Sequence, residues 1–158
     1  MDEKLKQFTL PLTQDEIVWK IQSFTKGTSP KTIVVPYIDN RAVMNRLDNC
    51  FGAENWSSSF TELKDGIKCT LTINGVSKED GADVTSIEPT KGGISDAMKR
   101  AATQWGLGRE LYDYPRVFVK GQQKFLSDPV KKALKNIDTS APVVVIGEDG
   151  SINGQAFN

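Results

Sequence analysis

The sequence predicts an α+β fold in which an antiparallel three-stranded meander is flanked by helices. Two turn signals, Lys64-Asp65-Gly66 and Asn74-Gly75, divide residues 56–84 into three extended segments. Every second residue of the middle segment is apolar, which predicts one buried face: Ile67, Cys69, Leu71 and Ile73. On both sides of this region, apolar residues recur at helical spacing and predict the flanking helices.

Two helices are expected before the meander. The capping-box pattern Thr13-x-x-Glu16 precedes apolar residues and predicts an amphipathic helix over residues 13–25. A short extended segment over 32–36 follows. A second helix is predicted over 39–50, with its first or second residue as the N-cap. Its spacing predicts an inward and an outward face, with Val43, Met44, Leu47 and Cys50 inward and Arg41, Asn45, Arg46 and Asn49 outward.

The most informative segment is residues 92–108, which predict a short helix after the meander. Its apolar stripe consists of Ile94, Ala97, Met98, Ala101, Ala102 and Trp105. Ser95 can cap its start, and the glycines at 106 and 108 can end it. Lys99 and Arg100 are adjacent on the opposite side. Two neighbouring cations on an outer face suit a phosphate backbone, although the solvated face of an ordinary amphipathic helix has the same pattern.

Weaker patterns follow this helix. Residues 117–119 are expected to be extended, and Asp128-Pro129 begins a small basic helix that continues to Asn136. Residues 1–138 are therefore assigned to one domain. Residues 139–158 are expected to form a mobile tail, in which 143–146 can still add a strand to a partner's edge. The basic residues of the small helix suit either a solvated face or duplex DNA, namely Lys131, Lys132 and Lys135.

The composition narrows the possible functions. The 158 residues have no net charge, but residues 91–135 hold ten Lys or Arg against four Asp or Glu, so an anionic partner is expected there. The absence of histidine, with only two cysteines, argues against a zinc site and against Ser-His-Asp catalysis. No P-loop motif, long apolar segment or signal region is present, so we expect a cytoplasmic protein that needs no ATP, metal or other cofactor.

Four stretches resemble the single-strand annealing superfamily typified by the eukaryotic Rad-fifty-two recombination mediator and the Sak-type phage proteins. They occur in the family's order, at residues 37–43 (YIDNRAV), 50–56 (CFGAENW), 78–81 (KEDG) and 95–106 (SDAMKRAATQWG). The resemblance covers residues 15–120 and suggests a phage or bacterial member. It implies a ring-shaped homo-oligomer that binds single-stranded DNA in a basic groove and anneals complementary strands without ATP, in recombination and DNA repair.

The resemblance also implies the DNA-contacting residues. Arg41 matches the groove arginine at the start of the family's second helix, and Lys99 and Arg100 match its adjacent Lys-Arg pair. The polar face of the meander adds weaker candidates, Lys64, Lys68 and Lys78, and Lys91 precedes the key helix at the rim. Ala53 stands where relatives often have an aromatic residue. A host single-strand-binding protein or a recombinase is a further candidate partner.

Two other functions fit parts of the sequence. A magnesium-dependent nuclease would use the carboxylates around the third strand, with Lys91 nearby: Glu79, Asp80, Asp83 and Glu88. Acidic residues around a turn are more often solvated, and their spacing matches no strict signature. A protein–protein adaptor without DNA contact is the second alternative.

Overall fold

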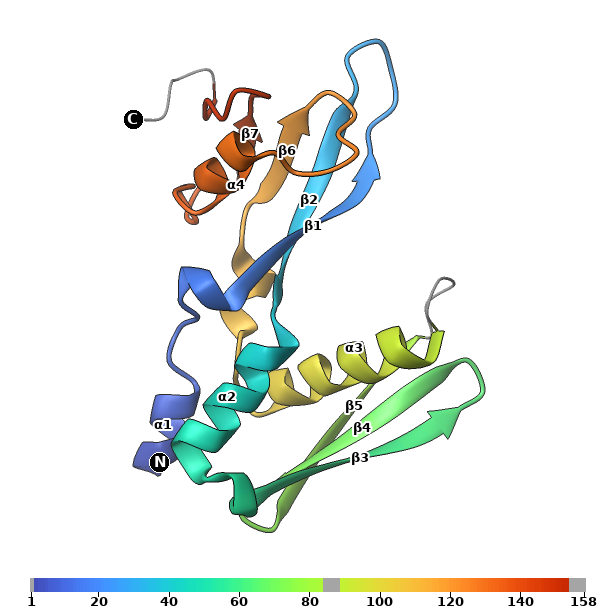
Figure 1. The fold of residues 1–158 in the computed structure, drawn as a ribbon, viewed down its shortest axis with the longest axis vertical. Coiled ribbons are helices and arrows are strands. Elements are labelled where there is room, and N and C mark those ends of the chain that lie inside the picture. Colours follow the sequence, from blue (N-terminus) through green and yellow to red (C-terminus); the bar gives the residue numbers. More distant parts are fainter. Residues whose placement is uncertain (1, 84–88, 154–158) are drawn as a thin grey trace. The chain divides into compact units, whose positions relative to one another are not determined.

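A computed structural model describes residues 2–83 and 89–153 (Figure 1). The chain divides into two compact units, and each is made from separate parts of the sequence. The first unit contains the described parts of residues 1–16 and 38–109, and the second contains those of 17–37 and 110–158. The chain therefore passes three times from one unit to the other.

The first unit contains the predicted meander. Strands β3 (Trp56–Leu63), β4 (Gly66–Ile73) and β5 (Val76–Asp83) form an antiparallel sheet in the order β3-β4-β5. Three helices accompany it, namely α1 (Glu3–Phe8), α2 (Asn40–Phe51) and α3 (Pro89–Gln104), together with a 3₁₀ turn at Ala53–Asn55. The predicted meander, its two turns and the helix over 39–50 are confirmed, and so is the α+β class.

The core of this unit lies between one face of the sheet and helices α2 and α3 (Figure 1). All four alternating apolar residues of β4 are buried, as predicted. They pack in one cluster with Val43 and Leu47 of α2 and with Ala97 and Ala101 of α3, all four of which are fully buried. Alanines on α3 allow the helix axis to approach the sheet closely, and this fixes the direction of its outer face.

Helix α3 differs from its prediction at both the start and the apolar stripe. It begins at Pro89 rather than at Ser95, because proline suits the first helical position. Ile94 keeps 37% of its surface exposed, so the stripe is buried only from Ala97 onward. The predicted end is confirmed: Gly106 has φ +98°, and a Cβ there would lie 2.8 Å from Cγ2 of Thr9.

The second unit is built on a four-stranded sheet. Its strands are β1 (Ile17–Phe24), β2 (Lys31–Ile38), β6 (Arg116–Lys120) and β7 (Val143–Ile146), in the order β1-β2-β6-β7. β2 and β6 are antiparallel, whereas β6 and β7 are parallel. Helix α4 (Asp128–Leu134) packs on one face and buries Val130, Ala133 and Leu134 against the strands. The extended segments predicted at 32–36 and 117–119 and the small basic helix are confirmed.

The helix predicted over 13–25 is wrong. The capping box does form, since Oε1 of Glu16 accepts a 2.9 Å hydrogen bond from the Thr13 amide, but it caps only the 3₁₀ turn Gln14–Glu16. Strand β1 follows at once. Trp19 and Ile21, two residues apart, pack on the core of the second unit, so burial follows the strand period rather than the helical one.

The mobile tail predicted for residues 139–158 is also wrong for its central part. Residues 143–146 form β7, which pairs with β6 of the same chain, and Val144 and Ile146 are buried. An isolated bridge also joins Ile146 to Ile152. The predicted boundary at residue 138 therefore separates β7 from the sheet to which it belongs. No helix in residues 2–83 and 89–153 is long and apolar enough to cross a membrane.

Candidate nucleic-acid interface

Helix α3 and strand β5 are joined through one carboxylate. Nε of Arg100 lies 3.4 Å from Oδ1 of Asp80, and Nε2 of Gln104 donates a 2.9 Å hydrogen bond to Oδ2. The Arg100 side chain is 53% exposed, whereas that of Asp80 is 22% exposed. The guanidinium group is thus oriented by the sheet and remains accessible to an anion from solvent.

The charge of Asp80 is stabilised by its surroundings. Partial burial raises the pKa of this carboxyl, but hydrogen bonds from Gln104 and the Gly81 amide, together with the charge of Arg100, outweigh burial and hold the pKa below its ordinary value. Asp80 is therefore ionised at neutral pH. A phosphate that approaches Arg100 must compete with this carboxylate.

Lys78 lies on the helix-covered side of the sheet. It pairs in register with Leu71, which is fully buried beneath the helices. Its Nζ lies 5.4 Å from the ring centroid of Trp105, and Nε1 of that indole donates a 3.1 Å hydrogen bond to the Leu71 carbonyl. The prediction that Lys78 lies on the polar face is therefore wrong. In the register that follows the Asn74-Gly75 turn, Lys78 is opposite the buried Leu71, whereas the residue opposite Lys68 is Gly81.

Lys68 lies on the opposite, polar face. Its Nζ is 3.3 Å from Oε2 of Glu79, and Thr70 donates a 2.9 Å hydrogen bond to the same oxygen. These two contacts, Thr70 first, hold the pKa of Glu79 below its ordinary value. Lys64 is exposed in the β3–β4 turn. The remaining residues of this face are mostly small and hydroxylated, and four of them are exposed: Ser57, Ser59, Thr61 and Ser77.

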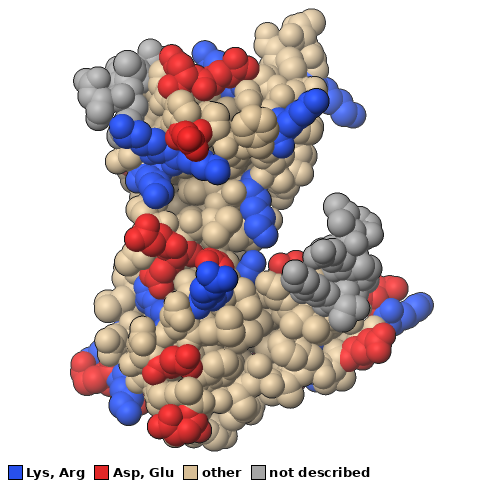
Figure 2. Space-filling view, viewed as in Figure 1, with Lys and Arg blue, Asp and Glu red and all other residues tan. Residues whose placement is uncertain are grey.

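The other predicted cations lie on the two helices. Arg41 is exposed in the first turn of α2, where its amide donates a 3.1 Å hydrogen bond to the capping carboxylate of Asp39. Lys99 is half-buried next to Arg100 on α3. Lys91 belongs to the first turn of α3, and its side chain lies outside the described residues. Figure 2 shows that Lys and Arg are interspersed with Asp and Glu on the surface in view.

Arg46 was predicted to face solvent, and the sequence did not indicate that it has a structural role. Its side chain is only 13% exposed, and Nη2 lies 2.6 Å from Oε1 of Glu16. Its other donors bind the carbonyls of Phe8, Leu10 and Pro11. Arg46 thus fixes the segment between α1 and the 3₁₀ turn to α2, and its hydrogen bond to Glu16 is the main reason that the pKa of this carboxyl is lowered.

Arg109 is a second arginine that sequence reasoning missed. Its Nε donates a 2.7 Å hydrogen bond to the Thr103 carbonyl, and Nη2 donates one of 2.8 Å to the Gln104 carbonyl. These are carbonyls at the end of α3 that lack partners within the helix. A basic residue just after a predicted helix end is a recognisable signal of such a cap.

The carboxylates considered for a metal site do not converge. Glu79 and Asp80 are consecutive on β5 and therefore point to opposite faces, where they contact Lys68 and Arg100 respectively. Within the described residues no group of three or more Asp, Glu or Cys side chains is placed to hold a metal ion. Glu88 lies outside the described residues. The nuclease alternative therefore gains no support from the geometry around β5.

The first unit is thus an α+β unit with helices on one face of an antiparallel meander and two adjacent cations, Lys99 and Arg100, on helix α3. The profile of the Rad52/22 family of double-strand break repair proteins matches residues 2–128. The chain belongs to this family.

Two relatives are bacterial proteins named single-stranded DNA-binding protein DdrA. The one from Deinococcus radiodurans is 32% identical over 117 residues, which cover 70% of this chain and 55% of the relative. The one from Deinococcus deserti is 35% identical over 121 residues, or 72% of this chain and 59% of the relative. The matched region thus spans less than two thirds of either relative.

Proposed function

We propose that this chain binds single-stranded DNA and anneals complementary strands without ATP, in bacterial or phage recombination and DNA repair. Family membership and the name of the DdrA relatives support this function. The observation that carries the proposal is the adjacent pair Lys99 and Arg100, on a helix whose opposite side is buried in the core. Rotation of the helix would expose its buried apolar side, so Lys99 and Arg100 are held on the outer side.

The chemistry of the cations suits annealing. Annealing requires a protein that holds the sugar–phosphate backbone and leaves the base edges free, and cations do this without reading sequence. Arg41 and Arg100 can bind two phosphate oxygens each, whereas Lys99 acts as a compact charge. If these three residues each neutralise one phosphate, the salt dependence of binding is a slope of about −2 per protomer. Lys64, Lys68, Lys78 and Lys91 are the secondary candidates.

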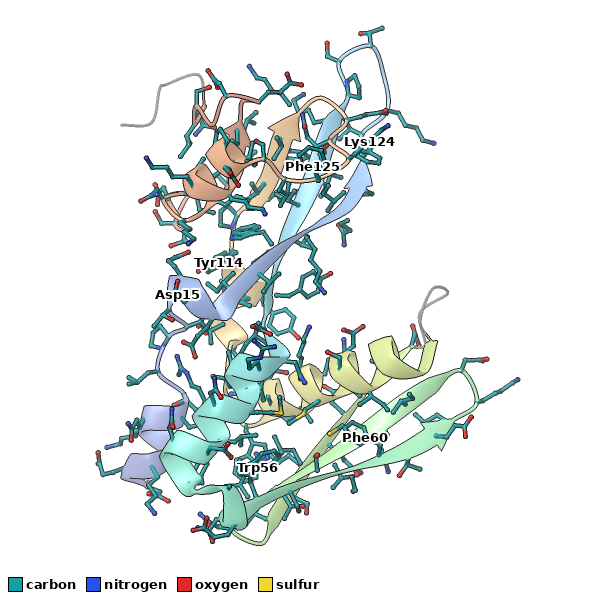
Figure 3. All side chains as sticks on the ribbon, viewed as in Figure 1. Asp15, Trp56, Phe60, Tyr114, Lys124 and Phe125 are labelled. Carbon is teal, nitrogen blue, oxygen red and sulfur yellow. The ribbon has the colours of Figure 1, made fainter. Side chains whose placement is uncertain are left out.

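We further propose that the chain assembles into a homo-oligomer, in the form of a ring. Three phosphate contacts bind weakly, but identical sites in an oligomer act together through their effective concentration. The meander offers a means of assembly, because β3 and β5 each pair with β4 on one side only. Phe60 on the edge strand β3 is 38% exposed, and Figure 3 labels it there. An incoming strand could pair along such an edge and cover this side chain.

The test is annealing of two complementary oligonucleotides by the purified chain, in EDTA and without nucleotide. Acceleration over the protein-free rate supports the proposal and shows that neither ATP nor a divalent metal is needed. Absence of acceleration, with shortened strands once Mg²⁺ is added, favours a nuclease. No effect in either buffer, and no binding to the separate strands, favours an adaptor.

A further inference from the structure

The second unit has a sheet face whose composition differs from that of the meander. Helix α4 covers one face of this sheet with Val34, Val117, Val119 and Val144 beneath it. The residues between these, along each strand, point to the other face. On β2 and β6 this face contains the register pairs Ile33 with Phe118 and Lys31 with Lys120. We call it the open face.

Three aromatic residues belong to the open face. Phe118 lies on it by register, and Tyr37 lies two strand periods from Ile33 on β2. Phe24 belongs to the open face as well. Trp19 and Ile21 of β1 pack on the side that α4 covers, so the even-numbered residues of β1 point to the open face. Phe24 is 45% exposed and Tyr37 is 37% exposed. Their rings therefore have accessible surface.

Cations accompany two of these rings. Nζ of Lys20 lies 5.3 Å from the Tyr37 ring centroid, and Cζ of Arg116 lies 5.3 Å from that of Phe118. Both distances are within the range of attraction between a cation and a ring face. The four strands contain no Asp or Glu. Two carboxylates after β7 lie near the end of β6: Asp149 interacts with Lys120, and Glu148 lies next to Gly121.

From this arrangement we infer that the open face is a second single-strand surface, on which nucleobases stack against Phe24, Tyr37 and Phe118 while Lys20, Lys31 and Arg116 bind phosphates. Aromatic rings that alternate with cations are the combination that holds unpaired strands without sequence preference. A second copy of this chain docked through the same face would bring Lys and Arg against Lys and Arg. The charge of the face thus favours a polyanion over self-association.

This surface is distinct from the α3 site. The α3 site provides cations and a carboxylate but leaves bases free, whereas the open face provides rings and therefore contacts bases. Trp56 and Trp105 of the first unit are partly buried, and both indole N–H groups donate to protein oxygens, Oδ1 of Asp48 and the Leu71 carbonyl. The inference needs single-strand binding by the chain but not the annealing activity proposed above.

The test compares binding of the full chain to a fluorescent thymidine 30-mer and to an abasic 30-mer with the same phosphates. The double variant Phe24→Ala/Tyr37→Ala should bind the thymidine strand at least about thirtyfold more weakly, because it loses two stacking contacts and each is worth roughly 1–3 kcal/mol. Its affinity for the abasic strand should be unchanged. Leu10→Ala is the control: it removes an exposed apolar side chain (56% exposed) from the first unit and should bind both strands as the parent does.

Two outcomes with the double variant overturn the inference. Normal thymidine binding by the double variant overturns the inference, while single-strand binding by the parent leaves the proposed function intact. A change in oligomer size on gel filtration also overturns it, because the face would then lie between copies. If the double variant fails to fold, photocrosslinking of the parent to a 5-iodouracil strand replaces it. Adducts on the peptides containing Tyr37 or Phe118 support the inference, and adducts confined to the first unit contradict it.

Discussion

Nε of Arg100 on α3 lies 3.4 Å from Oδ1 of Asp80 on β5. An arginine proposed to bind DNA phosphate is therefore already in contact with a carboxylate of the same chain. The carboxylate accepts a second hydrogen bond from Gln104 at 2.9 Å, which keeps it in place when the arginine moves away. A phosphate can therefore replace Asp80 at Arg100 without leaving the carboxylate unpaired. The contact orients Arg100 and at the same time weakens its attraction for DNA.

Asp80→Asn should tighten single-strand binding. The substitution removes one negative charge beside Arg100 and keeps an oxygen for Gln104, and the gain should be about threefold in Kd for a charge at this distance in a partly exposed site. Fluorescence anisotropy at 50 mM and 200 mM salt measures it, and the gain should shrink at the higher salt. Glu3→Gln removes an equal charge from α1 and should have no effect. Weaker binding by Asp80→Asn would mean that orienting Arg100 matters more than competing for it.

Lys99→Ala/Arg100→Ala should reduce the salt dependence of binding. Loss of two phosphate contacts lowers the slope by about 1.4 and the affinity at 0.1 M salt by about twentyfold. Annealing should slow accordingly, while the oligomer size on gel filtration stays the same. The control Lys4→Ala/Lys131→Ala removes the same charge from exposed positions on α1 and α4. Equal losses in both variants would assign the effect to net charge rather than to the α3 pair.

The ion pair between Glu16 and Arg46 should make stability depend on acid pH. The pKa of Glu16 is lowered in the folded state, so its stabilisation is complete above the unfolded-state pKa, near 4.5, and is lost as pH falls through the folded value. Glu16→Gln should lose about 2 kcal/mol at pH 7, because Arg46 is only 13% exposed. Urea unfolding from pH 7 to pH 3 measures both effects. The variant should show a smaller decline toward pH 3 than the parent.

Strand β7 should contribute to the stability of the second unit. Ile146 is fully buried, and Ile146→Ala should cost about 3 kcal/mol in the free energy of unfolding. Val143 lies on the same strand but is 44% exposed, so Val143→Ala should cost less than about 0.5 kcal/mol. Urea denaturation compares the two variants. Equal, negligible losses would restore the view of residues 139–158 as a tail.

Local patterns were sufficient to predict the meander and helices α2 and α3. In the meander, alternation along Ile67–Ile73 and the two turns agree with the pairing of neighbouring strands, so no distant partner is needed. Strand β1 shows the limit. Ile17, Ile21 and Phe24 have helical spacing. A helix is prevented by the pairing of β1 with β2 and by the packing of Trp19 on a cluster of Val34 and residues from 117–146.

The candidate site divides in the same way. The sequence places Lys99 and Arg100 together because they are adjacent on one helical turn. It does not show that Asp80 meets Arg100, since that contact depends on how α3 crosses β5. The sequence predicts Lys68 and Lys78 on one polar face, and only the strand register reveals that they lie on opposite faces of the sheet.

The pairing of β2 with β6 has a consequence for synthesis of the chain. Thr32, which is fully buried, donates its hydroxyl to the carbonyl of Gly121, 89 residues further along. At ordinary rates of translation, the β1–β2 hairpin leaves the ribosome on the order of ten seconds before its partner strand exists. During that interval one edge of β2 and the apolar side of the hairpin are uncovered. A nascent chain of this kind should therefore be a substrate for chaperones that bind exposed strands, and slowing translation after residue 110 should lower the yield of folded protein.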